Sequence, residues 1–208
     1  MSEPFSPLRK GIVICVSGPS GVGKGTVISA VLNRKTAVAH SISITTRSPR
    51  PGEQEGVSYY FRSKAEFERM LDQGDILEYD CYCDHYYGTP RQPLLEKVSQ
   101  GIDVLMDITV PGSLSVMQNY PEAITLFLLP PTFSELERRL RKRGTECEGI
   151  VQKRLQKAKE EINMTHFFQY VTVNDHLEQT VDRILAVIEA EHCRYNRQTG
   201  IETIVLSK

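Results

Sequence analysis

The sequence lacks a long apolar run, a strong net charge and a set of paired cysteines. No segment of its 208 residues reaches the ~20 consecutive apolar residues that a membrane-spanning helix needs, and residues 1–10 lack the apolar stretch of a secretory signal peptide. The formal net charge of -1 argues against a general affinity for nucleic acids or membranes. These absences predict an ordinary globular protein of the cytoplasm that binds anions only through local clusters of Arg and Lys.

Cysteines are few and dispersed, at Cys15, Cys81, Cys83, Cys147 and Cys193. Cys81 and Cys83 are close together, but no second pair completes a tetrahedral metal site. An odd, scattered set is typical of reduced thiols in a cytosolic compartment, and unreactive packing is the simplest role for them.

A glycine-rich segment joins an apolar run to a helical pattern near the N-terminus. Residues 18–26 read GPSGVGKGT, directly after IVICVS and directly before VISAVL. Glycines allow successive backbone N–H groups to point toward one anion, and the N-terminus of the following helix adds its positive dipole end. Lys24 adds a mobile full charge, so the segment predicts a phosphate cradle for a triphosphate.

This segment departs from the usual phosphate-loop pattern at one position. The pattern GxxxxGK[ST] is met through Lys24, but Gly25 follows, and the hydroxyl comes one residue later at Thr26. The GKGT ending resembles that of nucleoside monophosphate kinases, in which Thr26 would contact Mg2+ or a phosphate oxygen. The alternative is a glycine-rich turn that merely precedes a helix.

Short apolar segments alternate with amphipathic ones through most of the chain. This alternation predicts an α/β fold with a parallel sheet that helices cover on both faces. The expected strands are residues 12–17, 103–109, 123–129 and 170–174, and the expected helices include residues 133–143 and 178–192.

Three segments do not follow this alternation. Residues 41–90 are rich in turn residues, with a strand expected at residues 57–61, and predict an insertion with its own small sheet. Residues 143–149 combine charge with glycines, as suits a mobile flap. The tail after His192 leaves three alternatives: an edge strand, a contact with a partner subunit, or disorder.

Two arginines lie in a loop that prolines stiffen. Arg47 and Arg50 occur in the run TTRSPRPG. Phosphoryl transfer requires two phosphorylated partners to be aligned, and a planar guanidinium group grips a phosphate through two hydrogen bonds. We therefore expect these arginines to hold a second phosphate, the alternative being two solvated loop residues.

A second basic cluster covers residues 138–143, with Arg154 one helix later. On a helix, Arg139 and Arg143 are four residues apart and share a face, so a closing flap would bring both onto the transferring phosphate. A solvated helix face or a nuclear-localisation tract is the alternative.

Acidic and hydroxyl side chains could identify the base of the phosphate acceptor. Guanine presents N–H donors at N1 and N2, so carboxylates would complement it, whereas they would repel the bare N1 of adenine. Such matching discriminates by ~10^4 or more. The candidates are Glu78, Tyr87, Thr89 and Asp107, which spacing alone does not select from other polar residues.

Six motifs together carry a resemblance to guanylate kinases over residues 11–191. They are GPSGVGKGT at 18–26, SITTRSPRPGE at 43–53, GVSYYF at 56–61, HYYGTP at 85–90, RLRKRGTE at 139–146 and VND at 173–175. The resemblance implies ATP-dependent conversion of GMP, and of dGMP, to the diphosphate in purine nucleotide metabolism, with Mg2+ accompanying ATP. It implies a P-loop kinase with a parallel five-stranded core sheet flanked by helices, a GMP-binding insertion and a lid.

The resemblance also implies boundaries within a single domain. The P-loop core would comprise residues 1–42, 90–134 and 156–208, with the GMP-binding subdomain at 43–89 and the lid at 135–155. ATP and GMP or dGMP would be its partners, and the oligomeric state stays open.

Individual roles follow from the same motifs, residue by residue. The resemblance assigns the phosphate of GMP to Ser43, Arg47, Arg50, Tyr59 and Tyr87, with Glu53 supporting the arginine loop. It assigns the base to Glu78, Thr89 and Asp107. Catalytic roles fall to Lys24, Arg47, Arg139, Arg143 and Arg154. ATP would be held by Gly18, Pro19, Ser20, Gly21, Val22, Gly23, Lys24, Gly25 and Thr26, with Asn174 near the adenine and Thr26 as the metal contact.

One motif departs from the family pattern. The family strand usually reads Asp-x-Asp-x-Gln-Gly, whereas this chain has DITVPG at residues 107–112. Period-two alternation would place Asp107 and Thr109 on the same side of a strand, so a hydroxyl would replace a carboxylate that lines the nucleotide cleft. We expect a lower affinity or rate without loss of the reaction.

Two alternatives to an active guanylate kinase remain open. A guanylate-kinase-like interaction module would bind phosphopeptides without catalysis, and Thr109 is the feature that favours it. A kinase for another nucleoside monophosphate is disfavoured by Glu78 and Asp107.

Overall fold

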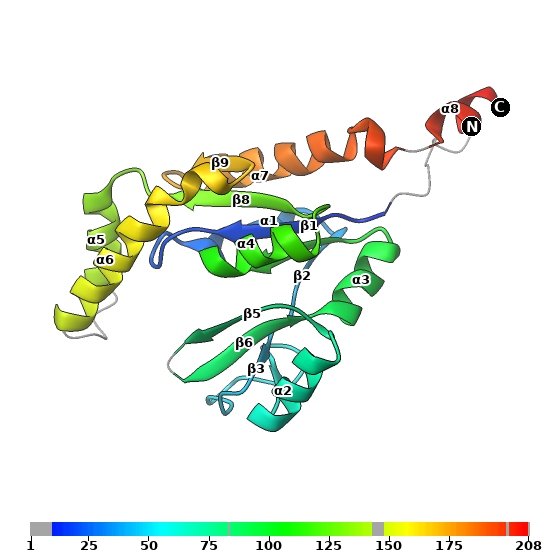
Figure 1. Cartoon of the computed structure of the whole chain (residues 1–208). Coiled ribbons are helices and arrows are strands. Elements are labelled where there is room, and N and C mark those ends of the chain that lie inside the picture. The colour runs from blue at the N-terminus through cyan, green and yellow to red at the C-terminus, as the bar shows by residue number, and fades with distance from the viewer. Residues whose placement is uncertain (1–9, 83, 143–147, 199, 208) are drawn as a thin grey trace.

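The computed structural model describes residues 10–82, 84–142, 148–198 and 200–207. Its central sheet has five parallel strands in the order β2-β7-β1-β8-β9. Their bounds are Val38–His40 (β2), Asp103–Asp107 (β7), Val13–Ser17 (β1), Ile124–Leu129 (β8) and Tyr170–Val173 (β9). Helices lie on both sides of this sheet, since parallel strands require crossover connections (Figure 1). The predicted α/β fold with a five-stranded parallel core sheet is confirmed.

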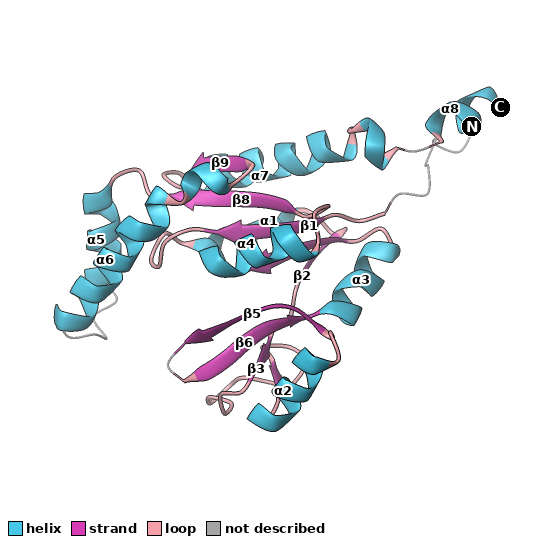
Figure 2. Ribbon diagram, viewed as in Figure 1, coloured by secondary structure: helices cyan, strands magenta, loops and turns pink. Residues whose placement is uncertain are grey.

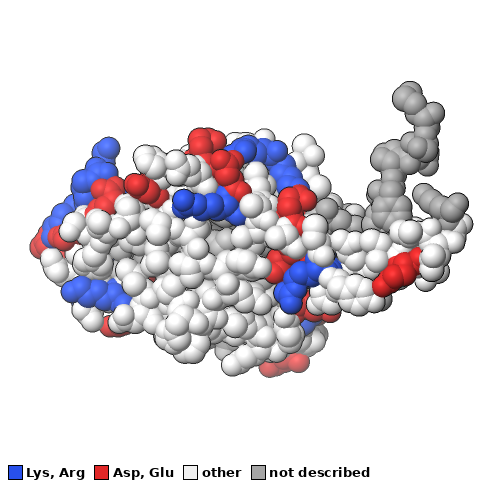
Figure 3. All heavy atoms as spheres, turned by 90° about the horizontal axis from the view of Figure 1, so that it is seen from above, with Lys and Arg blue, Asp and Glu red and all other residues white. Residues whose placement is uncertain are grey.

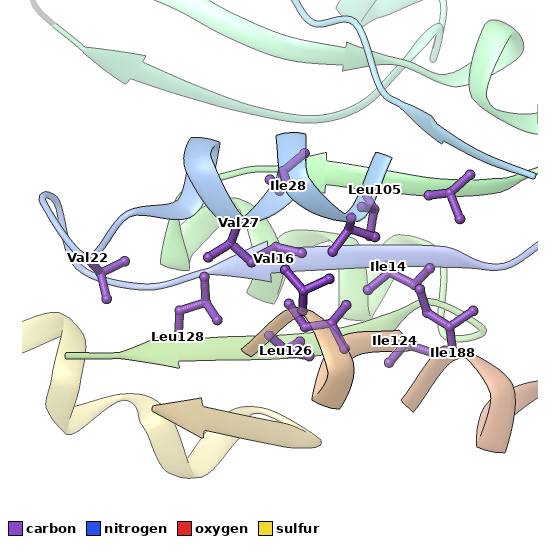
Figure 4. Close-up of a cluster of buried hydrophobic side chains, with 14 of the residues drawn as sticks. Ile14, Val16, Val22, Val27, Ile28, Leu105, Ile124, Leu126, Leu128 and Ile188 are labelled. Carbon is purple, nitrogen blue, oxygen red and sulfur yellow. The ribbon is translucent and has the colours of Figure 1, made fainter. Parts of the chain in front are cut away.

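The strand β1 is buried on both faces, which explains its uninterrupted apolar run. Ile14 and Val16 belong to the buried cluster on the side of helices α1 (Lys24–Arg34) and α7 (Leu177–His192). Figure 4 shows Ile28 of α1 and Ile188 of α7 in the same cluster. The intervening Cys15 faces the opposite cluster, formed with α3 (Arg91–Ser99) and α4 (Val110–Asn119). Complete burial from both sides fixes β1, and thereby the loop that follows it.

A second sheet lies within residues 44–90 and is separate from the central one (Figure 2). Its order is β4-β3-β6-β5, with bounds Tyr60–Phe61 (β4), Ile44–Thr45 (β3), His85–Pro90 (β6) and Ile76–Tyr82 (β5). Helix α2 (Lys64–Asp72) covers it through the fully buried Phe67. A turn shortens the strand expected at residues 57–61, because Ser58 N–H bonds back to the Gln54 carbonyl and Val57 is left 67% exposed.

Two neighbouring helices project at one end of the core sheet (Figure 1). They are α5 (Phe133–Lys142) and α6 (Glu148–Asn163), and residues 143–147 between them lie outside the described residues. Leu140 on α5 and Leu155 on α6 are buried in the same cluster as β1. The boundary expected between residues 155 and 156 falls inside α6.

The tail after α7 is helical, and the edge-strand alternative is wrong. It forms the short helices η2 (Tyr195–Arg197) and α8 (Ile201–Leu206), while η1 (Thr165–Phe167) lies earlier, between α6 and β9. Arg197 donates to the Glu122 carbonyl at 2.9 Å, which ties η2 to the body. Helix α8 lies apart from the body, and Leu206 is 86% exposed (Figure 1).

Charges of both signs are mixed on the face shown in Figure 3. Arg34 on α1 and Asp182 on α7 form one ion pair, at 2.8 Å. Interspersed charges of this kind produce no extended field of one sign. None of the helices in the described part of the chain combines the length and apolar character needed to cross a bilayer.

Candidate active site

The loop between β1 and α1 has the backbone geometry of a phosphate cradle. Gly21 and Gly23 have φ angles of +89° and +101°, a region that side chains with a Cβ rarely adopt. A Cβ on Gly23 would lie 2.9 Å from Asn174 Nδ2, and one on Gly21 would lie 2.7 Å from Leu140 Cδ2. The loop therefore needs glycine at both positions to bring its N–H groups together above the N-terminus of α1.

Lys24 begins α1 and folds back over the loop. Its Nζ donates a hydrogen bond to the Gly18 carbonyl at 2.8 Å. Gly25 has no atom within 4 Å of an added Cβ, so its lack of a side chain is not required by packing. Thr26 is exposed on the first turn of α1, where its hydroxyl is available to a ligand.

Asn174 and Arg139 meet at one carbonyl group of the loop. Asn174 Nδ2 donates to the Val22 carbonyl at 2.8 Å, and Arg139 Nη1 donates to the same oxygen at 3.1 Å. Glu135 orients the guanidinium group through a 2.8 Å bond to Arg139 Nε. Asn174 is 7% exposed and fastens the loop, so its contact with adenine stays a prediction.

Helix α6 contributes two further contacts to the same loop. Arg154 Nη2 donates to the hydroxyl of Ser20. Glu161, which the sequence did not single out, accepts a hydrogen bond from the backbone N–H of Ser20, and burial raises the pKa of its carboxyl. Ser20 is therefore held by a cation and a carboxylate from one helix. Arg143, the remaining predicted cation, lies outside the described residues.

The loop that carries Arg47 and Arg50, between β3 and β4 of the second sheet, is held by the carboxylate of Glu53. Glu53 accepts two bonds from Arg47, at 3.0 and 2.8 Å, and a third from the Arg50 backbone N–H at 2.8 Å. These bonds hold the pKa of Glu53 below its usual range. Arg47 also lies over the ring of Tyr59 and bonds to Tyr87, while Arg50 is exposed.

A cavity of about 230 Å³, the acidic cavity, opens between the second sheet and the carboxyl end of β7. Five predicted substrate residues line it: Ser43, Tyr59, Glu78, Tyr87 and Asp107. Asp80 also lines it and was missed. A signal for Asp80 exists, because residues two apart on a strand share a face and Glu78 was already a candidate.

The carboxyl group of Glu78 is buried at the floor of this cavity. It is 5% exposed, and its Oε1 accepts the hydroxyl hydrogen of the fully buried Thr89 at 2.7 Å. Burial raises the pKa of Glu78 to about 7; the charge of Asp80 raises it too, while the bond from Thr89 opposes the shift. Thr89 thus orients Glu78, and its contact with the base stays a prediction.

Thr109 lies in the cavity wall, but not on a strand as the alternation predicted. Strand β7 ends at Asp107, and Thr109 is the N-cap of α4, with its Oγ1 accepting the Gly112 N–H at 3.2 Å. The strand expectation is wrong because Pro111 in the first turn suits a helix start and a hydroxyl residue satisfies its free N–H groups. The hydroxyl still lines the cavity, as expected.

A larger cavity, of about 780 Å³, opens at the opposite end of the central sheet, beside Gly11, Tyr120 and Arg197. Its lining among the described residues includes no member of the phosphate loop. Ligands of open parallel sheets bind at the carboxyl ends of the strands, so the smaller cavity is the candidate site.

The cradle after β1, the arginine loop and the acidic cavity together are typical of a P-loop phosphotransferase. The guanylate kinase family model matches residues 9–191. A guanylate kinase of Halalkalibacterium halodurans is 46% identical over 189 residues, covering 91% of this chain and 93% of that protein. One from Latilactobacillus sakei is 47% identical over 190 residues, covering 91% and 94%.

A solved structure agrees with these relatives. The crystal structure of guanylate kinase from Anaplasma phagocytophilum superposes with a TM-score of 0.77 at 32% identity and covers 96% of both chains. The chain belongs to the guanylate kinase family.

Proposed function

We propose that this protein is an ATP:GMP phosphotransferase, which transfers the terminal phosphoryl group of ATP to GMP or dGMP. The observation that carries the proposal is the position of Asp107. Its carboxylate lines the acidic cavity at the end of β7, and it lies close enough to Lys24 for that positive charge to act to lower its pKa, against the rise that burial causes. The nucleoside cavity and the phosphate cradle are therefore neighbours at one edge of the sheet, as transfer between two nucleotides requires.

The residues divide between the two substrates by their place in the fold. The cradle at residues 18–26, with Lys24, holds the phosphates of ATP. Arg47 and Arg50 grip the phosphate of the acceptor, and Glu78 with Asp107 reads its base. Arg139, Arg154 and the predicted Arg143 neutralise charge on the group in transfer, because the loose transition state spreads charge over its oxygens.

The subdomain boundaries predicted above follow the same division. Residues 43–89 form the GMP-binding subdomain, residues 135–155 the lid, and the remainder the P-loop core. The lid cations reach the cradle from α5 and α6, which gives closure a direct effect on Val22 and Ser20.

The residues present fit a Mg2+ ion that arrives with ATP. Mg2+ prefers oxygen ligands and keeps phosphates and waters among them, and the exposed Thr26 hydroxyl on α1 is an oxygen donor beside the cradle. When bound, Mg2+ supplies charge neutralisation for the phosphates of ATP. We place the reaction in the cytoplasm, where both nucleotides are available.

A coupled assay of ADP release tests the proposal. ATP and Mg2+ are supplied with GMP, AMP, UMP or CMP in turn, and turnover is expected with GMP far above the other three. Preference for another nucleotide would make the chain a different nucleoside monophosphate kinase. Absence of turnover with tight binding of a phosphopeptide, measured by calorimetry, would make it an interaction module instead.

A further inference from the structure

Asp80 places a third carboxylate in the acidic cavity, beside those of Glu78 and Asp107. It lies two residues along β5 from Glu78, about 7 Å at the usual rise of a strand, and both line the cavity. The charge of Asp80 is close enough to Glu78 to raise the pKa of that residue. Carboxylates repel one another in a partly buried site, so a third one needs a compensating interaction.

Thr109 supplies part of that compensation from the opposite wall. Its hydroxyl donates to Asp80 Oδ2 at 2.9 Å, and the Cys81 backbone N–H donates to Oδ1 at 2.7 Å. Both oxygens are therefore fixed, and each keeps acceptor capacity for a further donor. The bond joins β5 of the small subdomain to the N-cap of α4 in the core.

Electrostatics favours one carboxylate and one hydroxyl at positions 80 and 109. Two carboxylates at this separation would repel, and one would have to remain protonated. The family pattern Asp-x-Asp would put a second carboxylate at position 109, whereas this chain has Thr109 there and its hydroxyl donates to Asp80.

We propose that Asp80 is a specificity-determining residue, which accepts a hydrogen bond from the 2-amino group of guanine, with Thr109 as its positioning partner. Guanine has three N–H donors on this edge, one at N1 and two at N2. The Glu78 carboxylate can pair with the N1 donor and one N2 donor, which leaves the second N2 donor for one of the two other carboxylates of the cavity, Asp80 and Asp107. Asp80 is the one that the Thr109 hydroxyl holds in position. This inference rests on the proposed function, because it assumes that GMP is the acceptor.

Inosine 5′-monophosphate is the matched probe, since it differs from GMP only in lacking the 2-amino group. The measurement is the ratio of kcat/KM for GMP to kcat/KM for inosine 5′-monophosphate. Asp80→Ala is expected to lower this ratio by about 10- to 100-fold, the range for loss of a hydrogen bond to a charged group, mainly through the KM of GMP. Asp80→Asn keeps an oxygen for Thr109 and should lower the ratio by less.

An exchange variant tests the positional argument directly. Thr109→Asp alone should raise the KM of GMP, because it sets two carboxylates against each other. The double variant Asp80→Thr/Thr109→Asp should regain most of the wild-type ratio, since it restores one carboxylate and one hydroxyl.

The two proposals fail in different ways. If the wild-type protein does not phosphorylate GMP, the proposed function is wrong. If it does, and Asp80→Ala weakens GMP and inosine 5′-monophosphate equally or leaves the ratio unchanged, Asp80 only connects the subdomains and the inference is overturned. Should Asp80→Ala fail to fold, calorimetry can compare the affinities of Asp80→Asn for GMP and inosine 5′-monophosphate. The ratio of the two affinities then tests the inference without an activity assay.

Discussion

The hydroxyl of Thr89 donates to Oε1 of Glu78 at 2.7 Å, at a point where neither side chain has appreciable contact with solvent. A carboxylate in such a place is costly to ionise, and this cost brings the pKa of Glu78 to about 7. The protonation state of Glu78, the proposed base-reading group, therefore changes near neutral pH.

The affinity for GMP should follow the ionisation of Glu78. Only the carboxylate form accepts N–H hydrogens with both oxygens, so the KM of GMP should fall as the pH rises from about 6 to about 8, through the pKa of about 7. Glu78→Gln should remove this dependence and raise the KM at pH 8. Steady-state kinetics across the interval check it, with the KM of ATP as the internal control; a GMP profile that Glu78→Gln leaves unchanged would remove Glu78 from base reading.

The same pKa predicts the sign of a stability change. Between the ordinary pKa of 4.5 and about 7, the folded protein keeps a proton on Glu78 that the unfolded chain has released. The contribution of Glu78 to the free energy of unfolding is therefore largest at low pH and falls as the pH rises across this window, by on the order of 3 kcal/mol in total. Urea unfolding at pH 5 and at pH 8 measures the change in the free energy of unfolding between the two conditions. This change should be smaller for Glu78→Gln than for the wild type; equal changes would contradict the assignment.

Loss of the Thr89 hydroxyl should move the Glu78 ionisation upward. The bond from Thr89 favours the carboxylate form, so Thr89→Val should shift the pH midpoint of the GMP KM above its wild-type position. It should also cost about 1 to 3 kcal/mol of stability through an unsatisfied buried carboxyl oxygen. Thr89→Ser, which keeps the donor, is the control and should retain the wild-type midpoint. An unmoved midpoint in Thr89→Val would show that the bond does not set the ionisation.

Gly21 and Gly25 should respond in opposite directions to alanine. Gly21 has a positive φ and lies against Leu140, so Gly21→Ala should destabilise the protein by about 1 to 3 kcal/mol and lower turnover. Gly25 lies within α1 with open space around it, so Gly25→Ala should stabilise by about 0.5 to 1 kcal/mol. Urea unfolding with turnover assays measures both. Loss of activity in a stable Gly25→Ala variant would mean that a phosphate approaches this Cα.

The core strands could be predicted because buried segments leave apolar runs in the sequence. The apolar run before Gly18 predicts a strand buried on both faces, and β1 is one. Strand β2, of three residues, was not predicted, because only one of its residues is buried and its position depends on pairing with β7. Short strands of this kind are specified by tertiary contacts more than by their own residues.

The site was only partly readable from sequence. The cradle and the arginine loop have local motifs, and the sequence singled out both. The contacts of Asp80 and Glu161 depend on segments brought together from distant parts of the chain, β5 with α4 and α6 with the phosphate loop. Thr109 was misplaced because alternation assumes that the strand continues, whereas a proline and a hydroxyl N-cap start a helix there.

Lys24 should be required for turnover and much less for folding. Its ammonium group is held over the loop by the Gly18 carbonyl, where it would face the phosphates of ATP. Lys24→Ala should lower kcat by about 100-fold or more, since it removes a fixed charge from the transition state. Single-turnover kinetics check the chemical step, and thermal unfolding supplies the folding control. Turnover within a few fold of wild type would exclude Lys24 from the phosphate site.

Variants of Arg47 and Glu53 should distinguish the binding of the GMP phosphate from the ordering of the loop that carries Arg47. Arg47→Lys keeps the charge but loses the planar pair of donors, so it should raise the KM of GMP by about 10-fold or more and leave the KM of ATP unchanged. Glu53→Gln keeps the shape but weakens all three bonds that order the loop, so it should raise the KM of GMP by less, because Arg47 itself remains. In the double variant the two effects should be smaller than their sum, because the residues act as one unit. Additive effects, or a larger effect on ATP than on GMP, would show that Arg47 does not hold the acceptor phosphate.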